Sequence, residues 1–469
     1  GASPAASKAQ AARVLAIETA LARASLAAVD KRNPYKLFHA MDAQALAKLT
    51  PHFDWRAFEA ALGLPAQERY NVTEPAFFEA FDQQLAALSL ADIKTYLRWQ
   101  LASSLAGTLS SDVAQLSFDF FQKTLHGTPQ QKPRWKRCVG LVDAQLGEAL
   151  GREFVERNFS PALKAKTVEM TEQIEVAMAA RIRELPWMSA ATKARALEKL
   201  GSIVNKVGYP DSWRDYGALQ VARDDFAGNV QRGHAFELRR QLAKIGKPLD
   251  RGEWQMTPQT VNAYYDAQMN DINFPAGVLQ PPLYDPKSDA APNYGNTGGT
   301  IGHELVHGFD DEGRQFDARG NLKDWWGPAD AKAFETRAAC VVEQYAKYTV
   351  VDDIKLNSKL TLGEDLADLG GLVLALVAWQ SEMTRLGLPL DEKRDGLSPA
   401  QRFFVGFAQW DCNDARPEAL RVQARTNPHS PGRYRINGVV VNMPEFAQAF
   451  HCKPGQALVK PAKQRCQVW

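Results

Sequence analysis

Cysteine is scarce in this sequence and odd in number. Only five occur among the 469 residues, and no two of them form a C-x-x-C pair. A zinc site built from cysteines, or a redox motif, is therefore not expected. Taken by themselves, the five are interpreted as buried free thiols, which pack like small apolar side chains.

Long hydrophobic runs and an excess of charge of one sign are missing as well. No stretch approaches the ~18 consecutive apolar residues that predict a transmembrane helix, and the most apolar run, residues 372–379, is too short. The formal net charge is +2 and no basic run occurs, so neither nucleic acid nor a membrane surface is implied as a partner. No signal peptide is visible, which does not by itself establish a cytosolic protein. The length suits about two or three globular domains.

The most informative motif is H-E-x-x-H, formed by His303, Glu304, Leu305, Val306 and His307. On a helix the two histidines share a face, with Cβ atoms about 5–6 Å apart, so both imidazoles can bind one Zn²⁺. The glutamate can reach a zinc-bound water, whose pKa falls to about 7, without binding the metal itself. The alternative is a chance match on a solvated helix face, and the two apolar residues on the opposite side argue against it.

A third ligand is expected from residues 363–371, which read G-E-D-L-A-D-L-G-G. Glu364 and Asp368 are four apart and share one helical face. One carboxylate can bind the metal while the other accepts the spare N–H of a ligand histidine. The alternative is an acidic helix start that the helix dipole favours. Asp365 points elsewhere and is expected to be solvated or to cap the helix.

The remaining patterns predict a mainly helical chain with one short sheet. Helices are expected over residues 11–26, around Ile93, around Met170 and from Ser189 to Gly201, with their apolar stripes in the core. Residues 207–212 are turn-rich, and we place a domain boundary near residue 216. β-prone residues between 256 and 274, with a turn at 270–271, predict a sheet beside the H-E-x-x-H helix. Taken alone, a histidine in the loop 427–435 is an ordinary hydrogen-bonded residue.

Together these motifs resemble the neprilysin and endothelin-converting-enzyme family of zinc metallopeptidases. The similarity extends to N-A-Y-Y at 262–265 and C-Q-V-W at 466–469, and it covers essentially the whole chain. The resemblance implies one Zn²⁺ per chain, with these roles: ligands His303, His307 and Glu364; general base Glu304; orienting carboxylates Asp310 and Asp368.

The substrate-binding residues of that family also have counterparts here. By resemblance, His429 in an H-S-P motif would donate a hydrogen bond to the oxyanion, and Arg435 would hold a substrate carbonyl. Asn262 and Ala263 would bind an extended peptide along an edge strand, and Val278 would line the hydrophobic pocket after the scissile bond. The implied activity is hydrolysis of short oligopeptides on the amino side of hydrophobic residues, by a zinc-bound water that the general base activates.

The resemblance further implies a mainly α, two-lobed neprilysin-like fold enclosing a large cavity. Residues 1–215 would form a helical covering lobe, incomplete here, and residues 216–469 a thermolysin-like zinc catalytic domain with a small β-sheet. The chain begins partway through the family pattern. We therefore expect a further N-terminal segment, and the substrate-binding arginines that it carries in relatives are not assigned to this chain.

The same resemblance changes the interpretation of the cysteines. It pairs Cys340 with Cys466 in a disulfide and implies an extracytoplasmic protein, periplasmic or secreted. Cys138, Cys412 and Cys452 would then be linked to the N-terminal segment; the competing outcome is a bond between the last two, with the first free. Two alternatives stay open: a zinc-stabilised peptide-binding module without turnover, and an intracellular peptidase with reduced thiols.

Overall fold

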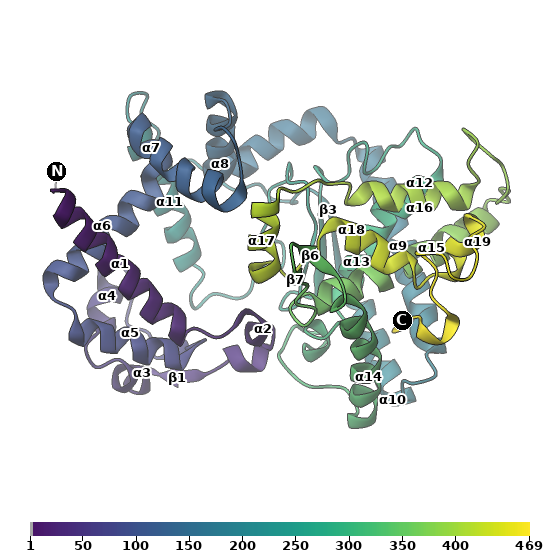
Figure 1. Cartoon of the computed structure of the whole chain (residues 1–469), viewed down its shortest axis with the longest axis horizontal. Helices are drawn as coiled ribbons and strands as arrows, with labels where there is room; N and C mark the ends of the chain where they lie inside the picture. The colour runs from purple at the N-terminus through teal and green to yellow at the C-terminus, as the bar shows by residue number, and fades with distance from the viewer. Residues whose placement is uncertain (1–2) are drawn as a thin grey trace. The chain divides into compact units, whose positions relative to one another are not determined.

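The computed structural model describes residues 3–469, a mainly α-helical chain (Figure 1). It divides into two compact units, each discontinuous in sequence. The first contains residues up to Thr124, Thr128–Gln131 and Leu219–Pro248; the second contains Leu125–Gly127, Lys132–Ala218 and Leu249–Trp469. This division differs from a single boundary near residue 216, because helices from the first half of the chain share the core of the second unit. The assignment of 1–215 to a covering lobe and 216–469 to a catalytic domain stays a prediction.

In its described residues, the first unit consists of α-helices of 4 to 21 residues and a two-stranded antiparallel sheet. Polar side chains start several of its helices: Asp42, Asp54 and Ser89 each accept a hydrogen bond from the backbone N–H three residues later. The last of these helices was predicted, but Leu97 and Leu101 on its expected core face are 59% and 60% exposed. Periodicity identifies an apolar helix face but not whether another element covers it, so that part of the prediction was wrong. The elements are α1 Pro4–Ala24, α2 Ala28–Lys31, β1 Ala40–Asp42, α3 Ala43–Leu49, α4 Trp55–Ala61, β2 Arg69–Asn71, α5 Pro75–Ala87, α6 Leu90–Leu105, α7 Ser111–Phe118 and α11 Phe226–Leu242.

The second unit is built around one large hydrophobic core. The predicted stripe of Met170, Ile174, Met178 and Ile182 is buried in it, and the helix expected from Ser189 begins at that cap. Its helices are α8 Arg134–Asn158, α9 Pro161–Glu184, α10 Ala190–Gly201, α12 Ala290–Asn293, α13 Gly299–His307, α14 Pro328–Tyr345, α15 Leu362–Arg385, α16 Pro399–Trp410, α17 Pro417–Thr426, α18 Gly432–Val440 and α19 Pro444–Ala449.

A three-stranded sheet lies beside α13, as the sequence predicted. Its order is β3 (Val204–Gly208), β5 (Asp271–Pro275), β4 (Tyr264–Asp266), and the central strand is buried throughout. The antiparallel pair β4–β5 turns at Asn270, which has a φ of 50°. Strand β3 pairs in parallel with β5 and was not predicted, because its partner lies more than sixty residues away. A second small antiparallel pair joins β6 (Thr349–Val351) to β7 (Ile354–Lys355).

Helices α13 and α15 approach each other closely at two glycines. A Cβ added to Gly302 would overlap the backbone of Gly371, and a Cβ added to Gly371 would overlap the backbone of His303. The missing side chains therefore allow the two backbones to touch. This contact brings residues of α13 and of the first turns of α15 to one place.

The segment after α13 is held by a buried lysine. Lys199 of α10 is 1% exposed, and its Nζ donates hydrogen bonds to the carbonyl oxygens of Gly313 and Phe316, at 2.7 and 2.8 Å. The ammonium also lies 5.7 and 5.5 Å from the ring centres of Tyr265 and Phe309. Burial lowers the pKa of Lys199 from 10.5 to about 7.

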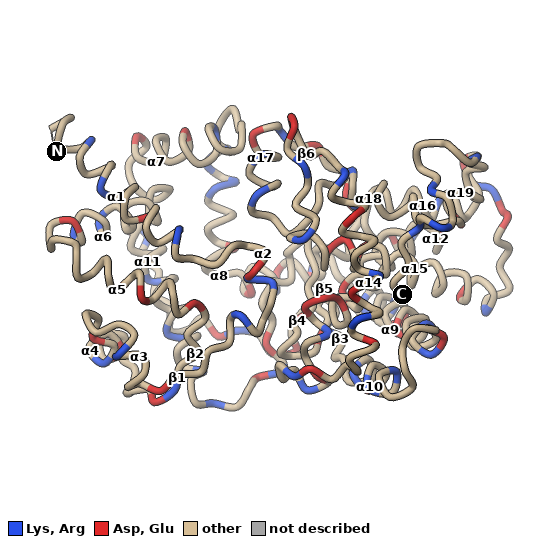
Figure 2. Tube along the Cα trace, turned by 60° about the horizontal axis from the view of Figure 1, so that its bottom comes forward, with Lys and Arg blue, Asp and Glu red and all other residues tan. Residues whose placement is uncertain are grey.

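Charged residues of both signs are interspersed along the trace (Figure 2). This mixture of signs along the chain agrees with the formal net charge of +2. No helix within residues 3–469 combines the length and the apolar character needed to cross a membrane.

Candidate metal and catalytic site

Two histidines of α13 face one another within the buried part of the second unit. His303 and His307 lie one turn apart, and their Nε2 atoms are 2.9 Å from each other. The rings are nearly perpendicular, with centres 4.5 Å apart. Because both Nε2 atoms converge on one point, a single cation there would meet both lone pairs.

The third group is Glu364, in the first turn of α15. Its Oε2 lies 3.2 Å from Nε2 of His303 and 3.7 Å from Nε2 of His307. His303, His307 and Glu364 form a potential metal-binding group, and their possible ligand atoms all lie within 4.8 Å of one another. No second group of this kind occurs within residues 3–469. Oε2 of Glu364 is buried, and no donor among residues 3–469 forms a hydrogen bond to it. Two imidazoles and one carboxylate are a donor set that suits Zn²⁺ and leaves a fourth position open.

Carboxylates lie behind both imidazoles. Nδ1 of His307 is hydrogen-bonded to Oδ2 of Asp310 at 2.7 Å. Nδ1 of His303 lies 2.8 Å from Oδ1 of Asp368, although it is too poorly aligned to form a good hydrogen bond. The Asp310 carboxylate is itself fixed by the backbone N–H groups of Glu312 and Gly313. A proton on Nδ1 leaves each Nε2 free for a metal, the arrangement typical of zinc histidines.

The electrostatics of the site favour a positive charge between these groups. Burial opposes charge on His307, but Glu364 and Asp310 outweigh it and raise the pKa of this histidine well above its usual value. Burial also opposes ionisation of Glu364, but the two histidines hold its pKa well below the usual range. The carboxylates around the two imidazoles would stabilise either a proton or a metal cation at this position.

Glu304 differs from Glu364 in its surroundings. It is 6% exposed, and its carboxylate forms no hydrogen bond or ion pair with residues 3–469. Burial raises the pKa of this carboxyl. A carboxyl group with a raised pKa and no fixed partner can exchange a proton with a nearby reactant.

Arg435 of α18 reaches the site through Asp368. Its Nε and Nη2 donate to the two carboxylate oxygens of Asp368, at 2.8 and 2.7 Å, and Nη2 lies 3.8 Å from Oε2 of Glu364. The guanidinium stacks over the ring of Trp410, 4.2 Å from its centre. The Arg435 side chain is thus held in one orientation by a bidentate pair and an aromatic face.

His429 also belongs to this group. Its Nε2 lies 3.2 Å from Oε2 of Glu364. On the other side of the ring, Nδ1 is 3.0 Å from Oδ1 of Asn427, which also accepts the backbone N–H of His429 at 2.9 Å. Burial lowers the pKa of His429. The structure therefore brings together His429, Arg435 and the three potential ligands, which the sequence places up to 132 residues apart (435 − 303).

Asp365 was expected to be solvated or to cap its helix, and the first expectation was wrong. The residue is fully buried, and burial raises the pKa of its carboxyl well above the usual value. Its Oδ1 accepts the hydroxyl of Ser430 at 2.6 Å, and its Oδ2 accepts that of Thr361 at 2.7 Å. Asp365 is buried because its position, one residue after Glu364, turns it toward the loop that carries His429.

The residues expected to bind a peptide main chain lie at the sheet edge. Asn262 and Ala263 directly precede β4, the edge strand of its sheet, which within residues 3–469 pairs with β5 on one side. Asn262 is exposed and Ala263 is buried. Val278 follows β5 in a tight turn and is 7% exposed. Within residues 3–469, no hydrogen bond or ion pair joins the side chains of these three residues to the two histidines, and their roles stay predictions.

Sequence reasoning missed three residues around the site: Asn427, Ser430 and Trp410. The first two flank His429 in the N-P-H-S-P stretch, so asking what holds that histidine would have indicated both. Trp410 has no such signal, because its contacts with Arg435 and with the ring of His303 join residues distant in sequence.

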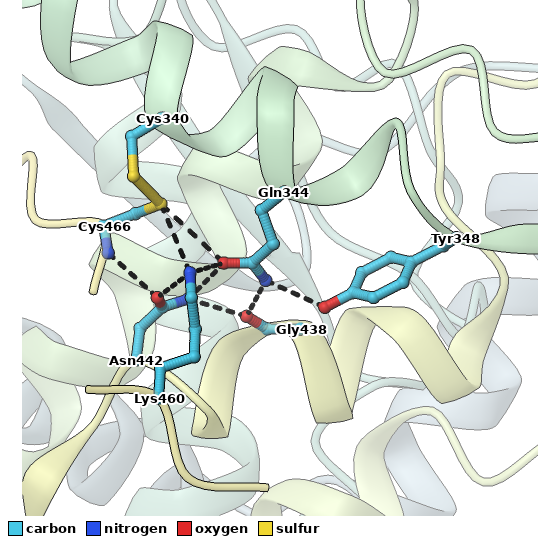
Figure 3. The surroundings of a disulfide bond; sticks show 7 residues. All are labelled: Cys340, Gln344, Tyr348, Gly438, Asn442, Lys460 and Cys466. Atoms are coloured by element: carbon cyan, nitrogen blue, oxygen red, sulfur yellow. Dashed lines mark hydrogen bonds between the residues drawn. A yellow bond between two sulfur atoms is a disulfide. The ribbon is translucent and has the colours of Figure 1, made fainter. Parts of the chain in front are cut away.

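The predicted disulfide between Cys340 and Cys466 is present, with Cα atoms 5.6 Å apart (Figure 3). A polar network surrounds it. The Nζ of Lys460 donates to Gln344 at 2.6 Å and to Asn442 at 3.1 Å, and Asn442 also accepts the backbone N–H of Cys466. The three other cysteines, Cys138, Cys412 and Cys452, are free.

Comparison with known proteins agrees with this geometry. Two models of peptidase family M13 match the chain, over residues 1–210 and 262–468. Endothelin-converting enzyme 1 of Homo sapiens is 35% identical over 471 residues, covering 97% of this chain and 60% of the human protein. The structure of Mycobacterium tuberculosis zinc metalloprotease Zmp1 in complex with an inhibitor has a TM-score of 0.94 at 40% identity, covering 98% of this chain and 70% of that one. PepO from Lactobacillus rhamnosis HN001 has a TM-score of 0.90 at 28% identity, covering 100% of this chain and 72% of that one.

The chain belongs to peptidase family M13. The predicted neprilysin-like, mainly α fold with small sheets is confirmed by these structural neighbours. The chain spans less than two thirds of its curated relatives, 60% of the human protein and 62% of the Bos taurus one.

Proposed function

We propose that this protein is a zinc-dependent endopeptidase. The observation that carries the proposal is the convergence of His303, His307 and Glu364 on one point, with an Oε2 atom that accepts no hydrogen bond. Glu304 adjoins them with a raised pKa and no fixed partner. Two imidazoles, one carboxylate and a nearby free carboxyl form a set suited to peptide hydrolysis at zinc.

The three converging side chains would hold one Zn²⁺. When bound, the metal would polarise a substrate carbonyl and lower the pKa of water in the site to near 7. Asp310 and Asp368 would keep the Nδ1 protons of the two histidines in place. Asp368 would also hold Arg435 in position for a substrate carbonyl, because two guanidinium nitrogens are already paired with it.

The chemical step would be carried by two further residues. Glu304 would take a proton from the attacking water and give it to the leaving amine, since it adjoins the three converging side chains without being one of them. Nε2 of His429 faces the same space and would donate a hydrogen bond to the oxyanion that forms from the substrate carbonyl. Each of these residues acts only on substrate and water, and none is needed to bind the metal.

The substrate would be an extended peptide. The open edge of β4 supports main-chain hydrogen bonds through Asn262 and Ala263. Val278, beside the buried strand β5, would contact the side chain that follows the scissile bond, giving cleavage on the amino side of hydrophobic residues. The restriction to short oligopeptides follows from the family resemblance rather than from a distance in this site.

The disulfide supports an extracytoplasmic location, periplasmic or secreted, because such bonds persist in oxidising compartments. The longer relatives and the three free cysteines support a partner segment. We propose that Cys138, Cys412 and Cys452 bond to N-terminal residues such as these relatives contain.

The experiment that tests the function combines a metal analysis with a peptide digest. The protein is loaded with zinc and incubated with an oligopeptide that contains one internal phenylalanine. We expect one zinc per chain and a cut before the phenylalanine, lost with a chelator and restored by zinc. Stoichiometric zinc without any cleavage would instead support the alternative, a zinc-stabilised peptide-binding module without turnover.

A further inference from the structure

Two consecutive residues of α15 meet two consecutive residues of the loop before α18. Glu364 faces His429, with Oε2 and Nε2 3.2 Å apart. The next residue on each side, Asp365 and Ser430, form a hydrogen bond of 2.6 Å. The two contacts run side by side, so the loop and the helix are joined both at the site and directly behind it.

The contact behind the site is the more deeply buried of the two. Asp365 is 0% exposed and Ser430 1%, whereas the side chain of His429 is 44% exposed. A buried carboxyl oxygen that loses its hydroxyl partner is left without a hydrogen bond at a cost in free energy, so this bond favours one position of the loop. The Ser430 backbone follows that of His429 directly, and fixing one limits where the other can place its ring.

The other restraints on His429 are weaker or local. Asn427 bonds it from two residues away within the same loop, and Gln423 of α17 donates to its carbonyl oxygen at 3.3 Å. Neither bond fixes the position of the imidazole relative to α15, the helix that carries Glu364. The Asp365–Ser430 bond does fix that position, because Asp365 follows Glu364 and Ser430 follows His429.

We propose that Asp365 and Ser430 are positioning residues that hold Nε2 of His429 at the reaction site. This inference rests on the proposed function, because it assumes that His429 acts on the substrate oxyanion. The hydroxyl of Ser430 holds the loop against α15, and the position of the loop determines where the imidazole of His429 lies. Loss of the hydroxyl lowers turnover and leaves zinc binding intact, since the Ser430 hydroxyl bonds Asp365 and none of the three side chains that would hold zinc.

The same carboxylate supplies a matched control. Thr361, at the start of α15, donates its hydroxyl to the second oxygen of Asp365 at 2.7 Å, and among residues 3–469 its side chain forms no direct hydrogen bond with the His429 loop. Thr361→Val and Ser430→Ala therefore remove equivalent hydrogen bonds from one acceptor. A purely structural role of Asp365 predicts similar effects of the two changes on activity. Positioning of His429 predicts an effect of the serine change alone.

The experiment measures kcat, KM and zinc content for Ser430→Ala, Thr361→Val, His429→Ala and the double variant Ser430→Ala/His429→Ala, with a hydrophobic oligopeptide. We expect Ser430→Ala to lower kcat by roughly tenfold to a hundredfold, since a misplacement of about 1 Å can cost about 10²-fold. KM and zinc content stay near the parent values. Thr361→Val keeps the parental kcat, and the double variant equals His429→Ala. A further variant, Ser430→Thr, retains a hydroxyl at this position and should keep more of the parental kcat than Ser430→Ala.

Each other result has a distinct meaning. An unchanged kcat in Ser430→Ala overturns the positioning role and leaves the proposed function standing. The same holds if Ser430→Ala lowers kcat by the same factor in the parent and in the His429→Ala background. A parental kcat in His429→Ala overturns both the oxyanion role and the inference that rests on it. Should Ser430→Ala not fold, Ser430→Cys decides by the same criteria, because a thiol has a similar shape and is a weak donor.

Discussion

Gly302 of α13 and Gly371 of α15 lie so close that neither position can accept a side chain. His303 follows the first glycine directly, and Asp368 lies one turn before the second. The distance between His303 and the Asp368 carboxylate behind it is therefore set by two glycines in backbone contact rather than by packed side chains. A site of this kind tolerates little error in the spacing of its two helices.

The first prediction concerns this crossing. Gly371→Ala should force α13 and α15 apart, because its Cβ would meet backbone atoms that cannot rotate away. Overpacking of this kind costs about 1–3 kcal/mol of stability. We expect weaker zinc binding, measured by competition with a chelator, and a lower unfolding midpoint. Gly140→Ala in α8, where a Cβ meets nothing within 4 Å, is the control and should leave zinc affinity unchanged. Equal zinc affinity in both variants would contradict the argument.

The second prediction separates metal binding from proton transfer. Glu304→Gln should keep stoichiometric zinc and lose turnover, because an amide cannot take a proton from water. Glu364→Ala should instead lose the metal, since one of three converging ligands is removed. Metal content by mass spectrometry and peptide hydrolysis are measured on the same samples. Unchanged hydrolysis in Glu304→Gln, or parental zinc affinity in Glu364→Ala, would show that the roles are assigned wrongly.

The third prediction concerns pH. Burial lowers the pKa of Lys199 from 10.5 to about 7, so above about pH 7 the unfolded state binds a proton that the folded state does not. The free energy of unfolding should then rise with pH between about 7 and 10.5, by at most about 5 kcal/mol. Below pH 7 both states are protonated and the contribution is constant. Lys199→Met should remove this rise.

Denaturant unfolding at fixed free zinc and several pH values between 7 and 9.5 checks the lysine. The exposed Lys8→Met is the control for a lost surface charge. The advantage of the parent over Lys199→Met should grow with pH, and Lys8→Met should run parallel to the parent. Parallel curves for all three proteins would mean that Lys199 stays charged, held by the Gly313 and Phe316 carbonyls.

The fourth prediction concerns the disulfide. The bond joins residues 126 positions apart, and the chain-entropy model gives a stabilisation of about 4.7 kcal/mol for a loop of roughly this length. The double change Cys340→Ala/Cys466→Ala should lower the free energy of unfolding by a comparable or smaller amount. Cys138→Ala, which removes a free thiol, is the control. A loss no larger than in this control would mean that the bond is absent from the isolated protein.

The fifth prediction concerns the three other cysteines. Non-reducing peptide mapping of protein from its native source should find Cys138, Cys412 and Cys452 each bonded to a peptide outside residues 1–469. A bond between Cys412 and Cys452 would contradict the partner segment. Three free thiols together with full activity of residues 1–469 alone would contradict it as well.

Much of the site could be predicted because its chemistry is local in sequence. The spacing of His303 and His307 depends only on helix geometry, and the confirmed family membership supports the fold drawn from the same motifs. The partners of Asp365 could not be predicted equally well. Ser430 lies 65 residues away, and no local pattern shows that a carboxylate beside a metal ligand faces the interior. Strand β3 was missed for the same reason, since a parallel pairing has no signal within the strand itself.

The disulfide has a practical consequence for handling the protein. Its covalent loop contains Glu364, His429 and Arg435, while His303, Glu304 and His307 lie outside it. The exposed stretch 386–396 falls inside the loop. A protease that cuts there would separate Glu364 from His429 along the chain, yet the two pieces would stay linked through Cys340 and Cys466. On a gel without reductant a nicked preparation would migrate close to the intact protein, and only a reduced sample would reveal the cut.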